Sequence, residues 1–358
     1  MNNWGRTCEQ QRFQIAVKFT NPAPEVLACL FFHSMLYCFQ RLGSRLRNTA
    51  KEEFQMSQKQ KKIRGIICTL IGGTAWGFSG TCGQYIFANC QMNSGTLASI
   101  RMLGAGILLC IFNLIVRKKS MFELWKHPVD AFRLVLFALG GLMFTQYAYL
   151  TAIGYSNSGT ATVLQNLGII LLMVITCIME RKLPLKNEVM AAILALAGVF
   201  LLATHGNPSE LVMSRDALEW GLIAAVAMAS YTLLPRGLLE KWGTLVVVGF
   251  AMLIGGIVLS CGFQIWKEPM DYSWNIIAAL FVIVVIGTLA AFSLYLQGVS
   301  DIGPVKASMI GCVEPVVATI LSTVWMGTTF AAIDLVGFVL IIGGVLLVSF
   351  KKETGRNQ

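Results

Sequence analysis

The sequence predicts an all-α membrane protein with ten transmembrane helices, arranged as two homologous five-helix halves of opposite orientation. Three observations predict it: apolar runs of about twenty residues recur from Ile63 onward, basic residues gather on alternate connections, and the second half repeats the first. At about 1.5 Å per residue, such a run crosses roughly 30 Å of hydrocarbon. The apolar share of 56 % and the charged share of 13 % agree with lipid as the main solvent.

Ten apolar runs follow one another along the chain. They show no strict two-residue alternation, which disfavours a membrane β-barrel and favours helices throughout. The expected spans are about residues 64–87, 95–116, 131–153, 160–179, 187–204, 218–239, 244–266, 274–297, 304–326 and 332–350.

The basic residues predict the orientation. A net charge of +10 would suggest a nucleic-acid partner in a soluble protein, but here the charges lie between the apolar runs. Counted over alternate connections, eighteen lysines and arginines fall on one side and three, Arg101, Arg215 and Lys267, on the other. Because basic connections stay inside, both termini, including the basic tail at 351–358, are expected in the cytoplasm, with the loop after Gly206 outside.

Residues 1–55 form an N-terminal extension that does not fit the pattern of spans. Val26 to Phe39 is apolar but only fourteen residues long, too short to cross a bilayer comfortably. No small-residue cleavage site clearly follows it, which disfavours a signal peptide. Two interpretations stay open: translation starts at Met56, so that the extension is not native, or the segment forms an interfacial helix.

An internal repeat divides the rest of the chain. At an offset of 146, Tyr149 reads against Tyr295, and a leucine follows each. The expected halves are residues 63–206 and 217–350, with five spans each. Five is an odd number, so the second half enters the membrane upside down relative to the first. Inverted repeats of this kind place a solute site at their interface near the bilayer midplane. Chance similarity among apolar helices is the alternative.

Motifs for metal, nucleotide or enzyme chemistry do not occur in the sequence. The ten cysteines sit mostly inside apolar runs without a CxxC pair, so we interpret them as packing residues. The three histidines share no ligand spacing, and neither GxxxxGK[ST], HExxH nor GxSxG is present. We therefore expect no metal, no cofactor, no nucleic-acid partner and no enzymatic activity.

Several short motifs, each weak alone, follow in a fixed order. They are Gly73-Thr74-Ala75-Trp76-Gly77-Phe78-Ser79-Gly80, Ser99-Ile100-Arg101, Gly104-Ala105-Gly106, Thr160-Ala161-Thr162-Val163-Leu164-Gln165, Glu180-Arg181-Lys182-Leu183, Ala197-Gly198-Val199, Glu314-Pro315-Val316 and Gly343-Gly344-Val345. Together, over about residues 60–350, they resemble the EamA-type ten-helix members of the drug/metabolite transporter superfamily. Two departures are Ile169, where the family usually has a proline, and Gly327-Thr328, where it usually has an acidic turn.

The resemblance implies a secondary transporter in the inner or plasma membrane. It would carry a small polar or amphipathic metabolite, such as an amino acid, by alternating access at the interface of two EamA repeats, with export as the favoured direction. The implied partners are this small-molecule substrate, membrane lipids and a coupled proton, and the protein would be a monomer or a homodimer. A flippase-like carrier of lipid-linked or nucleotide-linked substrates and a non-transporting membrane sensor are the alternatives.

Glu314, followed by Pro315, is the first candidate for the mechanism. It lies ten residues into the ninth expected span, or about 15 Å deep. An ionisable group at that depth costs at least about 2.5 kcal/mol and needs a partner, water or a proton. Pro315 cannot donate a backbone hydrogen bond, which favours a kink. We interpret the pair as part of a cavity lining, with Glu314 as a coupling or gating carboxylate that gains and loses a proton. A structural carboxylate is the alternative.

Polar and aromatic side chains in four spans are further candidates for substrate binding. Gln165 and Asn166, with Thr162 on the same face, can both donate and accept hydrogen bonds, which suits a polar solute. Hydrogen bonding between helices is the alternative for these residues. The third and eighth spans add Gln146, Tyr147, Tyr149, Tyr295 and Gln297, and the first adds Trp76 and Ser79.

Arg101 and two glycines complete the candidates. Arg101 begins about six residues inside the second span, close enough for its guanidinium to extend to the outer interface, where lysine would replace it. Binding of a carboxylate on the substrate is the alternative. Gly73 and Gly77, four residues apart, predict a close approach of the first helix to a neighbour, which is a packing role.

Overall fold

The computed structural model describes residues 58–349, with gaps at residues 91, 180, 182, 208–211, 236, 269–272, 303–306, 308 and 309. The described residues belong to one compact unit. The expectations for residues 1–55 and for the tail at 351–358 lie outside the described residues.

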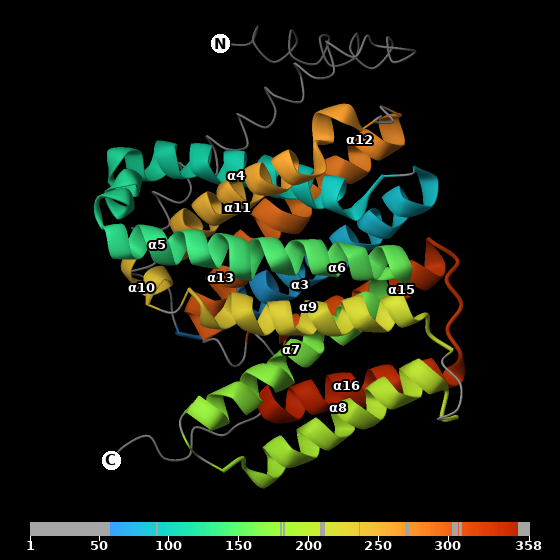
Figure 1. The fold of residues 1–358 in the computed structure, drawn as a ribbon. Helices are drawn as coiled ribbons and strands as arrows, with labels where there is room; N and C mark the ends of the chain where they lie inside the picture. The colour runs from blue at the N-terminus through green and yellow to red at the C-terminus, as the bar shows by residue number, and fades with distance from the viewer. Residues whose placement is uncertain are drawn as a thin grey trace, which may run out of the picture. The chain divides into compact units, whose positions relative to one another are not determined.

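Every regular element in the described part of the chain is a helix (Figure 1). The α-helices are α3 (Gln58–Asn89), α4 (Ser94–Arg117), α5 (Pro128–Leu136), α6 (Phe144–Tyr155), α7 (Ser158–Met179), α8 (Lys186–Thr204), α9 (Arg215–Leu233), α10 (Leu238–Trp242), α11 (Thr244–Phe263), α12 (Trp274–Phe281), α13 (Ala291–Ile302), α15 (Val313–Val324) and α16 (Ala332–Ser349). Short 3-10 helices cover Lys118–Lys126 and Ile265–Lys267.

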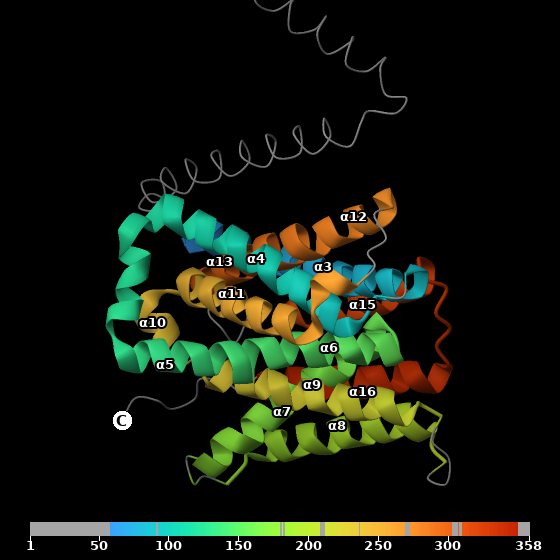
Figure 2. The same cartoon turned by 45° about the horizontal axis from the view of Figure 1, so that its top comes forward.

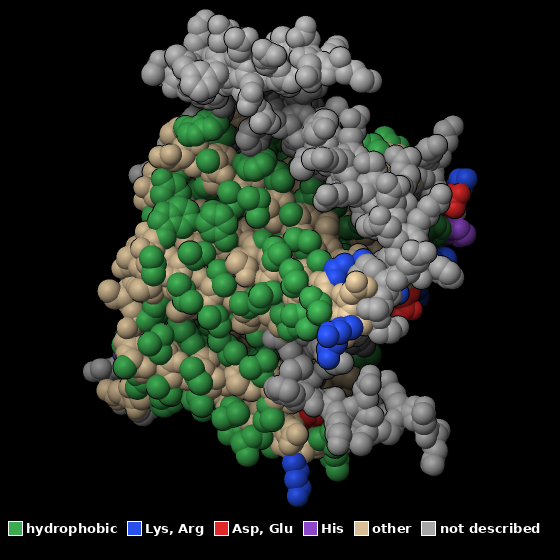
Figure 3. All heavy atoms as spheres, turned by 180° about the vertical axis from the view of Figure 1, so that it is seen from behind, with side chains coloured by type: hydrophobic (Ala, Val, Ile, Leu, Met, Phe, Trp, Pro, Cys, Tyr) green, Lys and Arg blue, Asp and Glu red, His purple; other side chains and the backbone are tan. Residues whose placement is uncertain are grey.

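Apolar length identifies membrane-spanning segments. Six are long and apolar enough to cross a bilayer: Ser94–Val116, Pro128–Tyr155, Ser158–Met179, Lys186–Thr204, Thr244–Phe263 and Trp274–Val299. Val313–Val324 and Ala332–Leu347 are apolar but shorter. Figure 3 shows a face covered largely by apolar side chains, with charged side chains gathered at one edge. The chain is therefore an all-helical protein with several membrane-spanning helices.

Helix pairing repeats between the two halves. α3 of the first half packs on α13 and α15 of the second, and α9 of the second packs in the same way on α6 and α7 of the first. α4 packs on α11 and α8 packs on α16, so these helices meet their own counterparts. Figures 1 and 2 show α8 beside α16 and α6 beside α9. Exchanging the two halves therefore reproduces the main helix contacts.

The connections lie at two opposite ends of the helices. α10 and the Lys118–Lys126 segment lie at one end in Figures 1 and 2, and the connections after α8 and after α15 lie at the other. At the first end, the Lys241 ammonium and the Trp242 indole N–H both donate to the Asp130 carboxylate, at 2.6 and 3.0 Å. At the second end, His205 and Asp334 lie 2.7 Å apart. Polar bonds between the halves thus close both ends of the helix bundle.

Two π-helical segments occupy matching positions in the halves. η2 (Phe137–Met143) joins α5 to α6, and η4 (Val282–Ala290) joins α12 to α13. The offset that relates Tyr149 to Tyr295 also brings the first segment onto residues 283–289, inside the second. π-helices are rare and occur mostly as single wide turns, frequently at functional sites. Apolar periodicity gives no sign of either segment, so the sequence analysis did not predict them.

Glycines on α3 set its distance from α15. A Cβ at Gly77 would lie 2.7 Å from the carbonyl oxygen of Glu314 and 3.0 Å from the Cβ of Val317. A Cβ at Gly73 would lie 2.7 Å from a methyl group of Val313. Real Cβ atoms essentially never come that close, so only glycine permits this approach. The packing role predicted for both residues is confirmed.

An apolar core lies where α7, α8 and α16 meet. Its buried members include Leu167 on α7, Leu202 on α8 and Ile341 on α16. Ala191 of this core packs against Gly344 through its carbonyl oxygen, which a Cβ at Gly344 would meet at 2.8 Å. Small residues therefore bring α8 and α16 together as they do α3 and α15.

The structure corrects the bounds of two expected spans. The span expected at 218–239 is α9, which ends at Leu233 and is followed by the short helix α10. The helix expected at 304–326 is interrupted: Ala307, Ile310 and Gly311 are helical, Cys312 lies in a turn, and α15 begins at Val313. The total of ten spans stays a prediction, because six described segments meet the length and hydropathy of a crossing helix.

The close contact at Gly77 predicts a stability difference between two glycine substitutions on one helix. Gly77→Ala should push α3 from the α15 backbone and lower the free energy of unfolding by about 1–3 kcal/mol, the usual cost of overpacking. Gly83→Ala is the matched control, because its Cβ would meet nothing closer than a leucine methyl at 3.4 Å. Thermal unfolding of the two purified variants in detergent would check this. Equal melting temperatures would contradict the contact.

Candidate functional site

Arg101 is buried between the two halves. It lies on α4, is 6 % exposed, and its Nε donates a hydrogen bond of 3.3 Å to Oγ1 of Thr288 in η4. The expectation that its guanidinium extends to the outer interface is therefore wrong, because the side chain turns inward toward the second half. An arginine has five N–H donors. Among the described residues Thr288 is the only hydrogen-bond acceptor it reaches.

The acceptor for Arg101 belongs to the wide turn of η4. Thr288 Oγ1 donates to the carbonyl oxygen of Ile283 at 2.9 Å, a bond that spans five residues. The preceding Gly287 lies against Ser79 of α3 so closely that any side chain at 287 would collide with it. Ser79 Oγ is buried and has no hydrogen-bond partner among the described residues. Arg101 and Ser79 therefore both pack against one turn.

A chain of buried hydroxyl groups continues from α3 to α6. The hydroxyls of Thr81 on α3 and Ser158 on α7 lie 3.2 Å apart, and those of Thr162 on α7 and Tyr149 on α6 lie 2.8 Å apart. Thr162 also donates to the Ser158 carbonyl oxygen at 2.7 Å. Gly80, next to Ser79, lies directly against the Tyr149 hydroxyl. The hydroxyl chain thus begins beside the turn that holds Arg101.

Glu314 lies at the start of α15. The helix begins at Val313, and Cys312 before it lies in a turn, so Glu314 and Pro315 both occupy the first helical turn. Ile310 and Gly311 before this turn are helical too, so the helix is interrupted just before Glu314 and Pro315, in agreement with the predicted kink. The N-terminal end of a helix carries a partial positive charge, which favours a carboxylate there.

The Glu314 carboxylate lies within electrostatic range of Arg101 but forms no ion pair with it. The two charges interact electrostatically, and the phenol groups of Tyr149, Tyr231 and Tyr295 interact with the same carboxylate. Among the described residues, no cation lies within the 4.0 Å of an ion pair with Glu314. Its side chain is half-buried. The buried Arg101 and the Glu314 carboxylate thus lie in one region without forming an ion pair.

Aromatic rings border this region on one side. Trp76, one helical turn before Ser79, lies 4.9 Å from the ring of Tyr295 and 5.2 Å from that of Phe292, measured between ring centroids. The structure therefore brings together Trp76 and Tyr295, which the sequence analysis chose separately. Tyr147 is not part of this group.

The other predicted residues have different surroundings. Tyr147 packs against Trp220 and Phe263, with ring centroids 5.5 and 5.4 Å away. Asn166 donates to the Thr162 carbonyl oxygen of its own helix at 2.8 Å. Gln165 is half-buried on α7, and Gln146 is buried on α6. Binding of a solute by these side chains stays a prediction.

The N-terminal end of α3 is tied to the second half by a bidentate ion pair. Arg64 donates through Nε and a terminal nitrogen to the two carboxylate oxygens of Asp301 on α13, at 2.8 and 2.7 Å. Gln297, a predicted site residue, donates to the same carboxylate at 3.1 Å. We call Arg64, Asp301 and Gln297 the inner latch, because the basic connections predict that this end faces the cytoplasm. Two parallel charge-assisted bonds are among the strongest polar contacts a protein makes.

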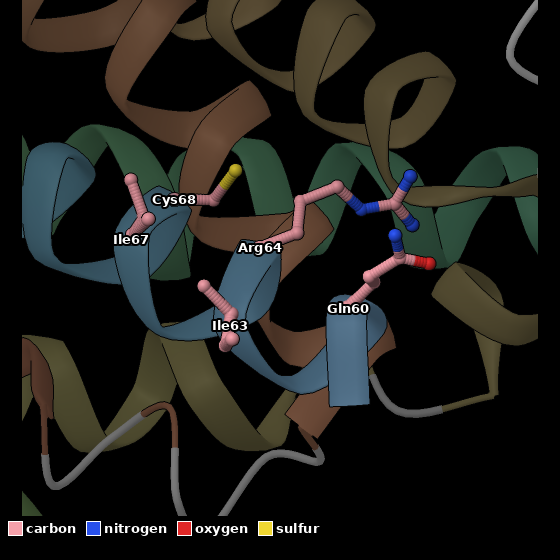
Figure 4. Close-up of a pocket in the computed structure, with 5 residues that line it drawn as sticks. All are labelled: Gln60, Ile63, Arg64, Ile67 and Cys68. Carbon is pink, nitrogen blue, oxygen red and sulfur yellow. The ribbon is translucent and has the colours of Figure 1, made fainter. Parts of the chain in front are cut away.

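A hollow of about 360 Å³ lies beside the inner latch (Figure 4). It is lined by Gln60, Ile63, Arg64, Ile67 and Cys68, all on the first turns of α3. Ile63 and Ile67 are about half exposed. An apolar, open lining of this kind suits contact with lipid rather than a polar solute.

The C-terminal end of α3 is tied to the second half by Gln84. Its Nε2 donates to the Thr328 hydroxyl at 3.0 Å, and its Oε1 accepts from the Ser158 backbone N–H at 2.9 Å and from Ser322 at 2.8 Å. We call Gln84, Ser158, Ser322 and Thr328 the outer latch. Beside it Trp325 stacks on Tyr85, with ring centroids 5.3 Å apart.

Sequence reasoning missed several of these residues. Thr288 and Asp301 lie in the second half, 187 and 237 positions from their partners Arg101 and Arg64, and no local pattern signals such pairs. Asp301 had one usable signal, because it is an acidic residue four positions after the candidate Gln297. Gln84 had none beyond being a polar residue near a span end.

The arrangement defines a class of protein: a polytopic helical membrane protein built from two structurally repeated halves, with buried charges where they meet. Comparison with known families assigns it further. The sequence model of the EamA-like transporter family matches residues 63–204 and 217–350. The chain belongs to this family, which confirms the resemblance to EamA-type drug/metabolite transporters.

Individual relatives support the same family assignment. The inner membrane transporter YicL of Salmonella typhimurium is 39 % identical over 286 residues, covering 80 % of this chain and 95 % of YicL. Protein PecM of Dickeya dadantii is 25 % identical and covers 70 % of this chain and 81 % of its own. A protein of known crystal structure superposes with a TM-score of 0.55 at 17 % identity, over 78 % of this chain and 96 % of its own, and so shares the fold. The family and its relatives identify a membrane transporter.

The bond between Arg101 and Thr288 predicts different effects of two substitutions. Thr288→Val should lower the free energy of unfolding by about 1.5–3 kcal/mol, the usual value of a hydrogen bond to a charged group. Thr288→Ser retains the hydroxyl and should stay within about 1 kcal/mol of wild type. The measurement is thermal unfolding in detergent. Identical curves for valine and serine would show that the bond contributes nothing.

Proposed function

We propose that the chain is a secondary transporter of the cell membrane, with ten transmembrane helices in two inverted repeats and both termini in the cytoplasm. It moves a small polar or amphipathic metabolite, outward by preference, by opening the region around Arg101 and Glu314 alternately to the two sides. The proposal is supported by the family assignment, by the repeated helix pairing and by the basic residues on alternate connections.

The observation that carries alternating access is the position of the two latches on one helix. Arg64 and Gln84 lie twenty residues apart on α3, or about 30 Å, close to the thickness of the hydrocarbon core. Each bonds to the second half, and between them on α3 lie Gly77, which packs against Glu314, and Ser79, which packs against Gly287 of η4. A solute can pass only if one latch opens while the other stays closed, because opening both would leave a leak.

Glu314 supports coupling of this movement to protons. Its carboxylate is in a region of low dielectric, where it interacts with one cation at a distance and with three phenol groups. Buried ionisable groups inside membrane spans commonly serve proton relays and substrate pathways. A change of proton occupancy would alter the charge balance at the contact of the two halves.

A tether across the inner latch should stop transport. A Cβ placed at Gly65 would lie 2.7 Å from the Cβ of Asp301. Cysteines at both positions can form a disulfide once the two helices separate by about 1 Å, because the bond needs a Cβ–Cβ distance of roughly 3.5–4.5 Å. In a background without native cysteines, we expect oxidation of Gly65→Cys/Asp301→Cys to abolish transport and a reductant to restore it. The single variants are the controls. Undiminished transport by the fully cross-linked protein would exclude this latch as a moving part.

Replacing Glu314 should separate exchange from accumulation. Glu314→Gln keeps the side-chain shape and fixes a neutral state, so exchange of solute should survive while accumulation driven by a pH gradient is lost. The solute is first found by comparing metabolites in cells and medium between a deletion and an overexpressing strain. Proteoliposomes with wild type or variant are then measured across an imposed pH gradient. Full pH-driven transport by the variant would make Glu314 structural, and a wild type without response would exclude proton coupling.

A further inference from the structure

Two buried features near η4 have a hydrogen-bonding capacity that the described protein does not use. Within the described part of the chain, Arg101 donates one N–H to Thr288 and reaches no other acceptor, and the buried Ser79 hydroxyl has no partner. Both pack against the Gly287-Thr288 turn, so they belong to one place in the fold. Unsatisfied donors in a buried region are costly unless something else accepts from them. The ligand that fits has acceptor oxygens and a negative charge.

The charges around the site limit the net charge of this ligand. Among the described residues, Arg101 is the only arginine or lysine that interacts with Glu314, and Glu314 is the only carboxylate that interacts with Arg101. The other titratable groups near Glu314 are Tyr149 on α6, Tyr231 on α9, Tyr295 on α13 and Cys312 before α15, all neutral acids. From α3 and α7, the residues against α15 include Gly73, Gly77, Gln84, Ser158 and Gly159, none of which titrates.

A single negative charge can enter this site without a net charge only if a proton enters with it. In the unliganded state Arg101 and an ionised Glu314 balance each other. A bound anion would add an uncompensated charge in a low-dielectric region, where charge interactions are strong. A proton taken from the aqueous side and held on the Glu314 carboxylate restores the balance. A dianion would need a second proton, and no second carboxylate interacts with the site.

We propose that Arg101 and Ser79 bind the carboxylate group of a small organic monoanion, and that each anion enters together with one proton on Glu314. The planar guanidinium can donate two parallel bonds to a carboxylate, which an ammonium cannot. The rings of Trp76, Phe292 and Tyr295, one helical turn from Ser79, suit an apolar or aromatic tail on the same ligand. The movement of this anion across the bilayer rests on the proposed transport function; its binding does not.

Binding by the purified full-length protein tests the inference apart from transport. The probes are phenylacetate and phenylacetamide, which share their shape and differ in charge. Isothermal titration calorimetry in two buffers of different ionisation enthalpy gives both the dissociation constant and the protons taken up. Above the pH at which Glu314 ionises, wild type should bind phenylacetate with uptake of about one proton per anion. Phenylacetamide should bind at least about tenfold more weakly, without proton uptake.

Three variants and a control assign the roles. Arg101→Lys should weaken phenylacetate binding at least about tenfold, because lysine cannot supply the bidentate bonds. Ser79→Ala should weaken it several-fold, and Glu314→Gln should retain binding but take up no proton. Arg215→Lys, at an exposed arginine on α9, should match wild type. Size-exclusion chromatography and thermal unfolding establish that each variant is folded.

The possible results distinguish failure of the proposed anion site from failure of the proposed transport function. Equal binding of acid and amide by wild type overturns the inference without reference to any variant, as does failure of phenylacetate to bind. Unchanged binding by folded Arg101→Lys, or proton uptake that persists in Glu314→Gln, overturns the corresponding part. If phenylacetate binds as expected and yet no solute crosses the proteoliposome membrane, the anion site stands and the transport function is wrong.

Discussion

The burial of a guanidinium inside a membrane protein is the constraint on which the rest of this structure depends. A charged side chain in the hydrocarbon region costs several kcal/mol unless protein groups replace its water. Arg101 meets this cost by crossing from the first half to Thr288 in the second and by facing the charge of Glu314. Because Arg101 lies in the first half and both of its partners lie in the second, the two repeats must stay in contact around this side chain. Arg101 makes one hydrogen bond to the second half and no ion pair with Glu314, so this contact can rearrange during a transport cycle.

Small residues allow the polar groups to come so close together. Gly77 brings α3 onto the first turn of α15, and Gly287 brings η4 onto Ser79. Between helices in lipid, close packing replaces the hydrophobic effect as the source of association. The buried hydroxyls of Thr81, Ser158 and Thr162 then bond mainly to one another and to their own helices, which satisfies them without drawing in water. Polar chemistry and tight packing are thus two aspects of one arrangement.

Sequence reasoning predicted the helical class and the family repeat because both depend on local composition and on order along the chain. It also selected Glu314, Trp76 and Ser79 as candidates, since a polar or aromatic side chain at mid-span is conspicuous among apolar neighbours. It misjudged Arg101, because depth along one helix does not reveal which way the side chain turns. The partners of Arg101 and Arg64 depend on contacts between the halves that one sequence does not encode locally.

The matched wide turns have a consequence for how the chain arose. One extra residue in a helical turn shifts every side chain beyond it by about a third of a turn, so its gain or loss in one half alone would misalign that half. Both halves have it at corresponding positions in η2 and η4. The simplest history is that a single five-helix ancestor already contained the insertion before its gene was duplicated and joined. Two copies of that ancestor, inserted in opposite directions, would have formed the same contact as an antiparallel dimer.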